Sequence, residues 1–361
     1  MHGGKRPLEA YGAQIAKKRL VLAAAVLLLL LLALGSLCAG SIRLSPGEVV
    51  SVLLGGESPK GATVVFGIRL PRIAAGVLVG AGLAVSGAVM QCVLHNPLAS
   101  ASTLGVSQGS AFGAALGIAV FGGGVVNSGT SHVAVEVNSP WIVTLCAFLF
   151  GMVSTAVILG LSRLKRGLGP GGMVLAGTAL SALFSGGSTL LQYFADDTKL
   201  GAVVFWTFGN LGSAGWKEIR VLALVFLGSF LYFMGNRWNY NALQSGADTA
   251  KSLGVNTRAV TLAGMTVCSF AAAVAVAFVG IISFIGLAAP HIMRKFVGDD
   301  YRFLIPCSAA AGALLLFLFI RDADVYACGG PETVTDASIR AVYGMEAEIL
   351  EYGGKKLVVP L

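Results

Sequence analysis

The sequence predicts an all-α fold, a polytopic transmembrane helical bundle with a short non-membrane tail, and three observations support this prediction. Hydrophobic residues make up 56% of the 361 residues and charged residues only 12%, whereas a soluble domain carries about 25% charged residues. Apolar runs of about 20 residues recur along the chain, and such a run crosses the roughly 30 Å hydrocarbon layer as a helix. Lipid offers no hydrogen bonds to the backbone, so helices are the expected form.

We expect about nine spans, the eighth short and its boundary with the seventh left open. A cytoplasmic segment (1–19) precedes them, a transmembrane domain (20–320) contains them, and a soluble tail (321–361) follows. The expected spans lie near residues 20–40, 73–94, 104–123, 141–162, 172–194, 220–236, 259–281, 282–294 and 303–320.

The first apolar run, "KKRLVLAAAVLLLLLLALGSLCAG", also resembles a secretion signal. Its apolar core is longer than the about 7–15 residues of a signal peptide. A lipid-attachment cysteine at Cys38 would normally follow a small residue, but Leu37 precedes it. We therefore favour a retained first span over a cleaved signal.

The net charge of +8 reflects membrane topology and does not indicate nucleic-acid binding. With nine spans threaded in order, the clusters of basic residues all fall on one side of the membrane, which the positive-inside rule makes cytoplasmic. We expect a multi-pass protein of the cell (inner or plasma) membrane. The clustered basic residues are Lys5, Arg6, Lys17, Lys18, Arg19, Arg163, Lys165, Arg166, Arg237, Lys251, Arg258, Arg294, Lys295 and Arg302.

No metal site is expected. The six cysteines form no CxxC pair, and a buried thiol behaves as a small apolar group. His291 follows Pro290 without a second histidine or a carboxylate at ligand spacing, so it is interpreted as a structural feature of a broken eighth helix.

The chain shows no energy source of its own. All seventeen acidic residues lie outside the expected spans, whereas ion-coupled transporters usually keep ionisable groups inside the bundle. The phosphate-binding pattern GxxxxGK[ST] is absent from the sequence. A pore subunit driven by a partner is therefore favoured, and an ion-coupled secondary transporter stays as the alternative, since carbonyls and hydroxyls can also hold sodium.

Three sequence blocks resemble the permease subunits of ABC (ATP-binding-cassette) importers for iron-siderophores, haem and cobalamin. The first is "IRLPRIAAGVLVGAGLAVSGAVMQCVLHNPLASASTLGVSQGSAFGAALG" (68–117), and "GADTAKSLGV" (246–255) and "GIISFIGLAAPHIMRKFVGDDYRFLIP" (280–306) follow in the same order as in that family. The likeness covers roughly residues 20–318.

The resemblance implies a ten-span fold in which two permeases, identical or paralogous, sit on two cytoplasmic ATPases. An extracytoplasmic binding protein would deliver the chelate, and the pore would alternate its access along the permease–permease interface. The chain itself would be no enzyme and would bind no cofactor, because ATP and magnesium would belong to the ATPase.

Small and uncharged polar residues suit a path for a bulky chelate. We expect the translocation path to include Ser86, Gln91, Asn96, Ser107 and Gln108. Glycines let membrane helices approach closely, and the candidates for packing are Gly82, Gly87, Gly105, Gly109 and Gly113. Pro97 disfavours helical geometry at Asn96 and predicts a turn there. For any single glycine, packing is favoured over a role in lining the path.

Two further sites are implied by the resemblance. Arg69 and Arg72 would dock acidic residues of the binding protein, since guanidinium groups recognise carboxylates in a bidentate manner; the alternative is interfacial snorkelling. The stretch "LQSGADTAKSLGVNTRAV" (243–260) would form short helices seated on the ATPase, with Gly246 and Gly254 as bends and Asp248 and Lys251 between them. A solvated loop would have a similar composition.

The last 41 residues depart from the family pattern, which continues into a tenth span. Residues 321–361 have no hydrophobic run long enough to cross, and the part from Gly329 onward resembles the C-terminus of the ATPase subunits. We expect a helix near 335–343 and two short strands there, on the extracytoplasmic side. The hypothesis is a deletion, frameshift or assembly error, and an inactive remnant of a permease is the alternative function.

Overall fold

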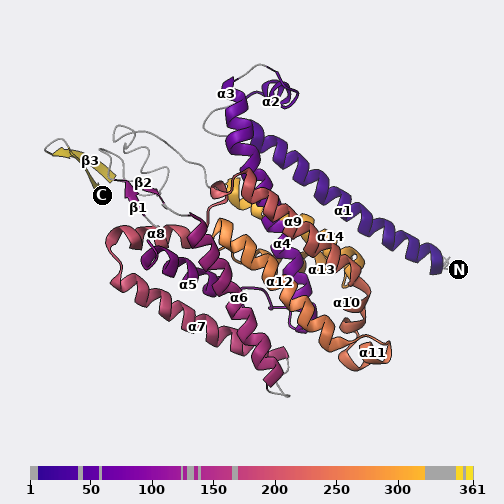
Figure 1. Cartoon of the computed structure of the whole chain (residues 1–361). Helices are drawn as coiled ribbons and strands as arrows, with labels where there is room; N and C mark the ends of the chain where they lie inside the picture. The colour runs from indigo at the N-terminus through magenta and orange to yellow at the C-terminus, as the bar shows by residue number, and fades with distance from the viewer. Residues whose placement is uncertain are drawn as a thin grey trace.

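The computed structural model describes residues 7–39, 44–56, 59–122, 125–127, 134–136, 140–164, 170–321, 347–352 and 355–360. Within these ranges the chain forms a bundle of helices with two small hairpins (Figure 1). The helices are α1 (Pro7–Cys38), α2 (Pro46–Leu53), α3 (Pro59–Ala62), η1 (Thr63–Arg69), α4 (Leu70–Val93), α5 (Val106–Ala119), α6 (Pro140–Leu164), α7 (Pro170–Phe194), α8 (Asp197–Thr207), η2 (Leu211–Ser213), α9 (Trp216–Gly235), α10 (Arg237–Gln244), α11 (Ala247–Ser252), α12 (Thr257–Val279), α13 (Ile285–Val297) and α14 (Tyr301–Arg321).

Each of the nine expected spans coincides with a helix, namely α1, α4, α5, α6, α7, α9, α12, α13 and α14, and the all-α class is confirmed. Among the described residues, six helical stretches are long and apolar enough to cross a membrane: Tyr11–Cys38, Thr63–Val93, Trp141–Arg163, Gly171–Phe194, Trp216–Gly235 and Thr257–Val279. The α5 and α13 helices have only 14 and 13 residues. At a rise of about 1.5 Å per residue, each covers only part of the hydrocarbon layer.

The α4 helix occupies the centre of the bundle. It contacts α9, α12, α13 and α14, and 72% of its most apolar window is buried. The α1 helix lies along the outside (Figure 1), with only 6% of its window buried. An apolar helix with few buried side chains suits contact with lipid, whereas most side chains of α4 must be satisfied inside the protein.

Glycine contacts bring the α4 backbone against two neighbouring helices. A Cβ atom at Gly87 would overlap the carbonyl group of Gly286 in α13, and a Cβ atom at Gly80 would overlap that of Gly312 in α14. Only residues without side chains allow this approach, which increases dispersion contacts between helices where lipid supplies no hydrophobic driving force. The position of Gly82 is different, because a Cβ atom there would make an ordinary 3.8 Å contact with Phe226.

The α5 helix packs in the same manner on α6. A Cβ atom at Gly109 would lie 2.7 Å from the carbonyl oxygen of Phe150, and one at Gly113 would overlap that of Cys146. Gly105 precedes α5 with a φ of +75°, and its hypothetical Cβ atom would lie 2.8 Å from Ser154 Oγ. Steric space and backbone conformation therefore both favour glycine at position 105.

The irregular segment between α4 and α5 is largely buried among helices from Ala99 onward, whereas Leu98 is 63% exposed. Ala99 and Leu104 are 0% and 1% exposed. Its backbone groups find partners: Ser154 Oγ donates to the Leu104 carbonyl at 2.8 Å, and the Leu98 amide donates to Asn96 Oδ1 at 2.9 Å. Non-helical backbone at membrane depth is tolerated only when it is satisfied in this way or lines a water-filled cavity.

Two short antiparallel hairpins complete the described structure. Strands β1 (Val125–Asn127) and β2 (Ala134–Glu136) form one, and β3 (Ala347–Tyr352) and β4 (Lys355–Pro360) form the other. The two strands expected in the tail are therefore present. The helix expected at 335–343 lies outside the described residues, as do Lys5, Arg6, Lys165 and Arg166.

We predict that Gly87→Ala destabilises the protein while Gly82→Ala does not, although both substitutions add one methyl group to α4. Overpacking against the backbone of Gly286 costs about 1–3 kcal/mol. The change at Gly82 adds a methyl group at ordinary contact distance from Phe226 and replaces a helical glycine, which is neutral or stabilising by up to about 1 kcal/mol. Thermal unfolding of the purified chain in detergent measures both effects. Equal melting temperatures for the two variants would contradict the close α4–α13 contact.

Candidate functional site

The basic end of the bundle contains a polar cluster that joins several helices. Figure 1 shows α10 and α11 at one end of the bundle and α2 and α3 at the other. At the first end, Lys18 of α1 lies over the Phe303 ring of α14, 5.3 Å from its centroid. From the positive-inside rule we expect this end to face the cytoplasm.

Most of the expected path residues are buried within the single chain. Ser86, Gln91 and Ser107 are 1%, 3% and 4% exposed, whereas Asn96 and Gln108 are half-buried. Ser107 Oγ lies 3.0 Å from Ser102 Oγ. The Ser86 hydroxyl and the Gln91 amide nitrogen have no hydrogen-bond partner in the described structure. Three of the five candidates therefore contact neighbouring helices rather than an open surface of this chain.

Gln91 forms a hydrogen bond with Arg294, which was not proposed as a site residue from the sequence. Its Oε1 accepts a short hydrogen bond from Arg294 Nη1 of α13. The Arg294 Nε atom also lies 3.1 Å from Asp299 Oδ1. The charge of Arg294 is thus shared between an acidic residue at the surface and an amide in the interior of the bundle.

Tyr301, the first residue of α14, joins this pair to two more helices. Its side chain is 0% exposed. The hydroxyl donates to the Ala88 carbonyl of α4 at 3.1 Å and accepts from Gln244 Nε2 of α10 at 3.1 Å and from Arg294 Nη2 at 3.3 Å. One buried hydroxyl therefore contacts α4, α10 and α13. We refer to Tyr301, Gln244, Arg294 and Gln91 as the Tyr301 cluster.

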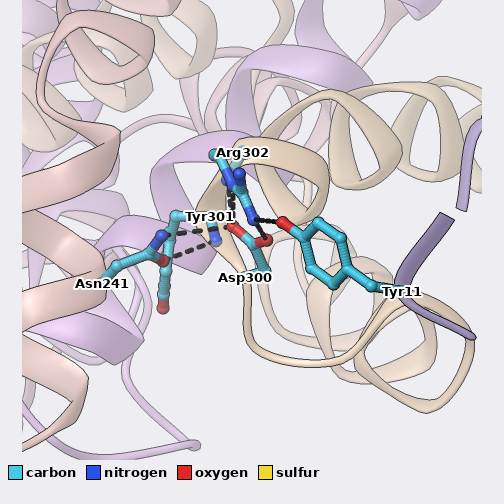
Figure 2. Close-up of polar contacts among 5 residues, drawn as sticks. All are labelled: Tyr11, Asn241, Asp300, Tyr301 and Arg302. Carbon is cyan, nitrogen blue, oxygen red and sulfur yellow. Dashed lines mark hydrogen bonds and ion pairs between the residues drawn. The ribbon is translucent and has the colours of Figure 1, made fainter. Parts of the chain in front are cut away.

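Asp300 and Arg302 flank Tyr301 and tie α14 to α1 and α10, as Figure 2 shows. Arg302 Nε lies 3.0 Å from both Asp300 carboxylate oxygens, and Nη2 reaches Oδ2 at 2.6 Å. Arg302 Nη2 also donates to the Tyr11 hydroxyl at 3.3 Å. Asn241 donates from Nδ2 to Asp300 at 3.1 Å and accepts the Tyr301 amide at 2.8 Å.

Opposing effects act on the pKa of Asp300, whose side chain is 18% exposed. Burial raises the pKa, but hydrogen bonds from Arg302 and Asn241 together lower it below its ordinary value of 3.8. The ionised carboxylate is the better acceptor for these donors, so the contacts favour the charged form. Asp300 is therefore an anion that holds three elements of the bundle together.

The α10–α11 segment is anchored on one face and exposed on the other. Tyr240, Leu243 and Ala250 are 0%, 1% and 0% exposed. The side chains of Lys251 and Asp248 are 61% and 98% exposed and lie 3.1 Å apart. An ion pair this exposed contributes little to stability, so the outer face of α11 is free to contact a partner.

Two glycines bend the chain on either side of α11. Gly246 has a φ of +107° and Gly254 a φ of +82°, values that side chains disfavour. No atom lies within 4 Å of a hypothetical Cβ at Gly254, so its backbone conformation is what favours glycine there. The bends expected from the sequence are therefore present.

The C-terminal end of α4 also contacts the α10–α11 segment. His95 Nε2 lies 3.1 Å from the Leu243 carbonyl oxygen, and Cys92 Sγ lies 3.5 Å from that of Tyr240. His95 has a φ of +45°, an unusual conformation for a residue other than glycine. Contacts from α4 and α14 thus hold α10 at two separate places.

The opposite end contains the two arginines expected to dock a binding protein. Arg69 ends the π-helix η1, and its Nη1 donates to the Leu37 carbonyl of α1 at 2.5 Å. The Nε atom of Arg72 is buried without a hydrogen-bond partner in the described structure. Trp216 Nε1 of α9 donates to the Phe66 carbonyl of η1 at 2.9 Å. Arg69 thus also fastens the end of α1.

No cluster of three potential metal ligands occurs among the described residues. His291 is exposed on α13. The residues missed by the sequence interpretation are Tyr301, Asp300, Asn241 and Gln244, together with the site role of Arg294 and Arg302. The motif "GDDYRF" (298–303) was available as a signal, since it falls in a block used for the family resemblance.

Comparisons with known proteins identify the relatives of this chain. The sequence model of the FecCD transport family matches residues 27–321. A Methanocaldococcus jannaschii protein whose name assigns it as an ABC transporter permease is 51% identical over 284 residues, which are 78% of this chain and 80% of the relative. The iron(3+)-hydroxamate import permease of Bacillus subtilis is 38% identical over 255 residues, 70% of this chain and 62% of that protein.

Two further matches agree with these. The vitamin B12 import permease of Escherichia coli O157:H7 is 35% identical over 283 residues, 78% of this chain and 80% of the relative. A solved ABC transporter assigned to the metal-chelate type, in an inward-facing conformation, superposes with a TM-score of 0.71 at 32% identity. That match covers 84% of this chain and 92% of the other. The fold and the sequence blocks thus point to the same group of proteins.

We predict that Tyr301→Phe destabilises the chain and that Tyr240→Phe does not. Both side chains are 0% exposed, and their ring centroids are 5.7 Å apart. The Tyr301 hydroxyl has three partners, and its loss leaves buried groups unsatisfied at a cost of roughly 1–3 kcal/mol. The Tyr240 hydroxyl is buried without a partner, so its removal is neutral or stabilising. Thermal unfolding in detergent measures both, and equal losses would contradict the hydrogen-bond assignment.

We predict an acid-dependent stability that Asp300→Asn removes. Because the pKa of Asp300 is lowered in the folded state from 3.8, its contribution is present above the unfolded-state value and is lost as the pH falls through the lower folded-state value. The melting temperature of the wild type should fall in that acidic window, and that of Asp300→Asn should fall less. Asp248→Asn, at a side chain that is 98% exposed, is the matched control and should follow the wild type.

Proposed function

Because the chain belongs to the FecCD transport family, we propose that it is the membrane-spanning permease of an importer for an iron chelate, haem or a corrinoid. Proteins of this family are pore subunits in the membrane and not enzymes, and ATP is hydrolysed by a partner ATPase. Relatives named as importers of iron(3+)-hydroxamate and vitamin B12 supply the two substrate chemistries. We infer that ATP and magnesium bind to the ATPase and that this chain holds no cofactor.

The observation that carries this proposal is the construction of the α10–α11 segment. Glycine bends isolate α11 between Gly246 and Gly254, buried anchors fix one face, and Leu253 at its end is 67% exposed. An apolar residue beside exposed charges on a rigidly anchored short helix is suited to a protein partner. We propose that Gly246, Asp248, Lys251, Gly254 and Leu253 form the surface that contacts the ATPase.

The opposite end of the bundle would receive a substrate-binding protein. The unpartnered Nε atom of Arg72 supports an external acceptor, because a buried guanidinium donor is costly to leave without a hydrogen bond. Arg69 already donates to Leu37, so Arg72 is the stronger of the two candidates. A carboxylate on the binding protein could accept the hydrogen bond that the Arg72 guanidinium leaves unmade.

The half-buried positions of Asn96 and Gln108 leave both side chains accessible to a path between two permeases. Gln91 and Ser86, in contrast, lie inside the single chain. We propose that a second permease, identical or paralogous, completes the path and that access alternates at that interface. Lipid would cover the exposed face of α1, where Leu27, Leu30 and Leu31 are 59%, 56% and 56% exposed.

Reconstitution in liposomes tests the proposal and its alternatives. The chain is purified with candidate ATPases and a binding protein, and hydrolysis and uptake of a ferric hydroxamate or cyanocobalamin are measured together. Hydrolysis stimulated by the loaded binding protein is the expected result. Uptake driven by an ion gradient without any ATPase would contradict the proposal. The absence of both activities would favour an inactive remnant.

We predict that Leu253→Asp weakens association with the ATPase roughly tenfold, since burying a charge in place of an apolar contact costs more than about 1.4 kcal/mol. Leu54→Asp is the matched control, because Leu54 is 83% exposed after α2, at the other end of the bundle. Copurification and titration of the ATPase onto the chain in nanodiscs measure the affinity. An equal loss in both variants would indicate a general defect, and no loss at Leu253 would contradict the proposed surface.

A further inference from the structure

The Tyr301 cluster forms a continuous polar connection from the α10–α11 segment to the centre of the bundle. Gln244 of α10 donates to the Tyr301 hydroxyl, Arg294 of α13 donates to the same hydroxyl, and Arg294 also donates to Gln91 of α4. Gln91 and Gln244 are therefore joined through two intermediate side chains. Hydrogen bonds inside a protein strengthen one another where water is excluded.

The connection ends at a side chain that is only partly satisfied. Gln91 is 3% exposed, its Oε1 accepts from Arg294, and its Nε2 has no partner in the described structure. A buried donor without an acceptor is costly. A second arrangement of α4 in which Nε2 finds an acceptor would therefore gain free energy, and the present arrangement depends on the hydrogen bond from Arg294.

Packing alone does not account for the cluster. Tyr240 occupies the same interior as Tyr301, with its ring 5.7 Å away, and it is equally buried. Its hydroxyl nevertheless contacts no polar group of the described residues. Of these two neighbouring tyrosines, one fills space and the other connects three helices.

We propose that Tyr301 and Arg294 are positioning residues that couple displacement of the α10–α11 segment to the position of Gln91 in α4. A shift of α10 weakens the hydrogen bond from Gln244 to the Tyr301 hydroxyl, which leaves the hydroxyl oxygen to accept from Arg294 alone while it still donates to the Ala88 carbonyl. Arg294 then changes its hydrogen bond to Gln91. The role of this coupling in transport rests on the proposed function, in which α11 contacts the ATPase, whereas the coupling itself is a property of this chain.

A double-mutant cycle on the purified chain tests the coupling without any partner. Gln244→Ala and Gln91→Ala change two residues that are joined in the described structure through Tyr301 and Arg294 rather than by a direct hydrogen bond, so independent effects on stability would add. We expect the melting-temperature shift of the double variant to differ from the sum of the single shifts. The difference should persist in a Tyr240→Phe background and vanish in a Tyr301→Phe background. Additive shifts in the wild-type background would overturn the proposal, as would non-additivity that survives Tyr301→Phe.

Reconstituted transport tests the consequence for function. Gln244→Ala changes an exposed residue and serves where Tyr301→Phe yields too little folded protein. We expect either variant to reduce the amount of ferric hydroxamate or cyanocobalamin imported per ATP hydrolysed at least fivefold, while Tyr240→Phe leaves this ratio unchanged. A purely structural defect lowers both quantities together and keeps the ratio constant, and that result would overturn a coupling role. Wild-type chain without stimulated hydrolysis would instead contradict the proposed function, and the double-mutant cycle would still decide the coupling.

Discussion

The absence of hydrogen-bonding solvent in the bilayer is the constraint on which the rest of this structure depends. It confines the apolar runs to helices, because only a helix satisfies its own backbone. It also requires that the non-helical segment after α4 bury its backbone against side chains such as Ser154, whose hydroxyl lies 2.8 Å from the Leu104 carbonyl oxygen. The glycine contacts of α4 have the same origin, since helices in lipid associate through close packing rather than through exclusion of water.

The polar groups of the described chain are distributed unevenly along the bundle. The middle is dominated by alanine, glycine and aliphatic contacts around α4, whereas the basic end contains the Tyr301 cluster and the Asp300–Arg302 pair. An apolar interior lets helices shift with little change in polar contacts, while a hydrogen-bonded end has discrete partners that are either made or broken. The polar contacts at the basic end can therefore switch between partners, while the middle of the bundle acts as a packed scaffold.

The extent of prediction from sequence differs between the fold and the site. All nine expected spans correspond to helices, because hydropathy is a local property that reads directly from the chain. The short eighth span was expected, but the length of α5 was less predictable: the run 104–123 carries no charge, yet the positive φ of Gly105 delays the helix until Val106. The burial of Gln91 could not be predicted from the sequence, because a polar residue in a span can either line a cavity or contact another helix.

By itself, the sequence determined the membrane class, the order of the helices and the family, because these follow from composition, spacing and motif. Only the tertiary structure decided which polar groups meet. Arg294 and Gln91 are 203 positions apart in the chain, and Tyr301 and Ala88 are 213 apart. Contacts at such separations depend on how α4, α13 and α14 pack. Their close approach at glycines brings together side chains that no local pattern connects.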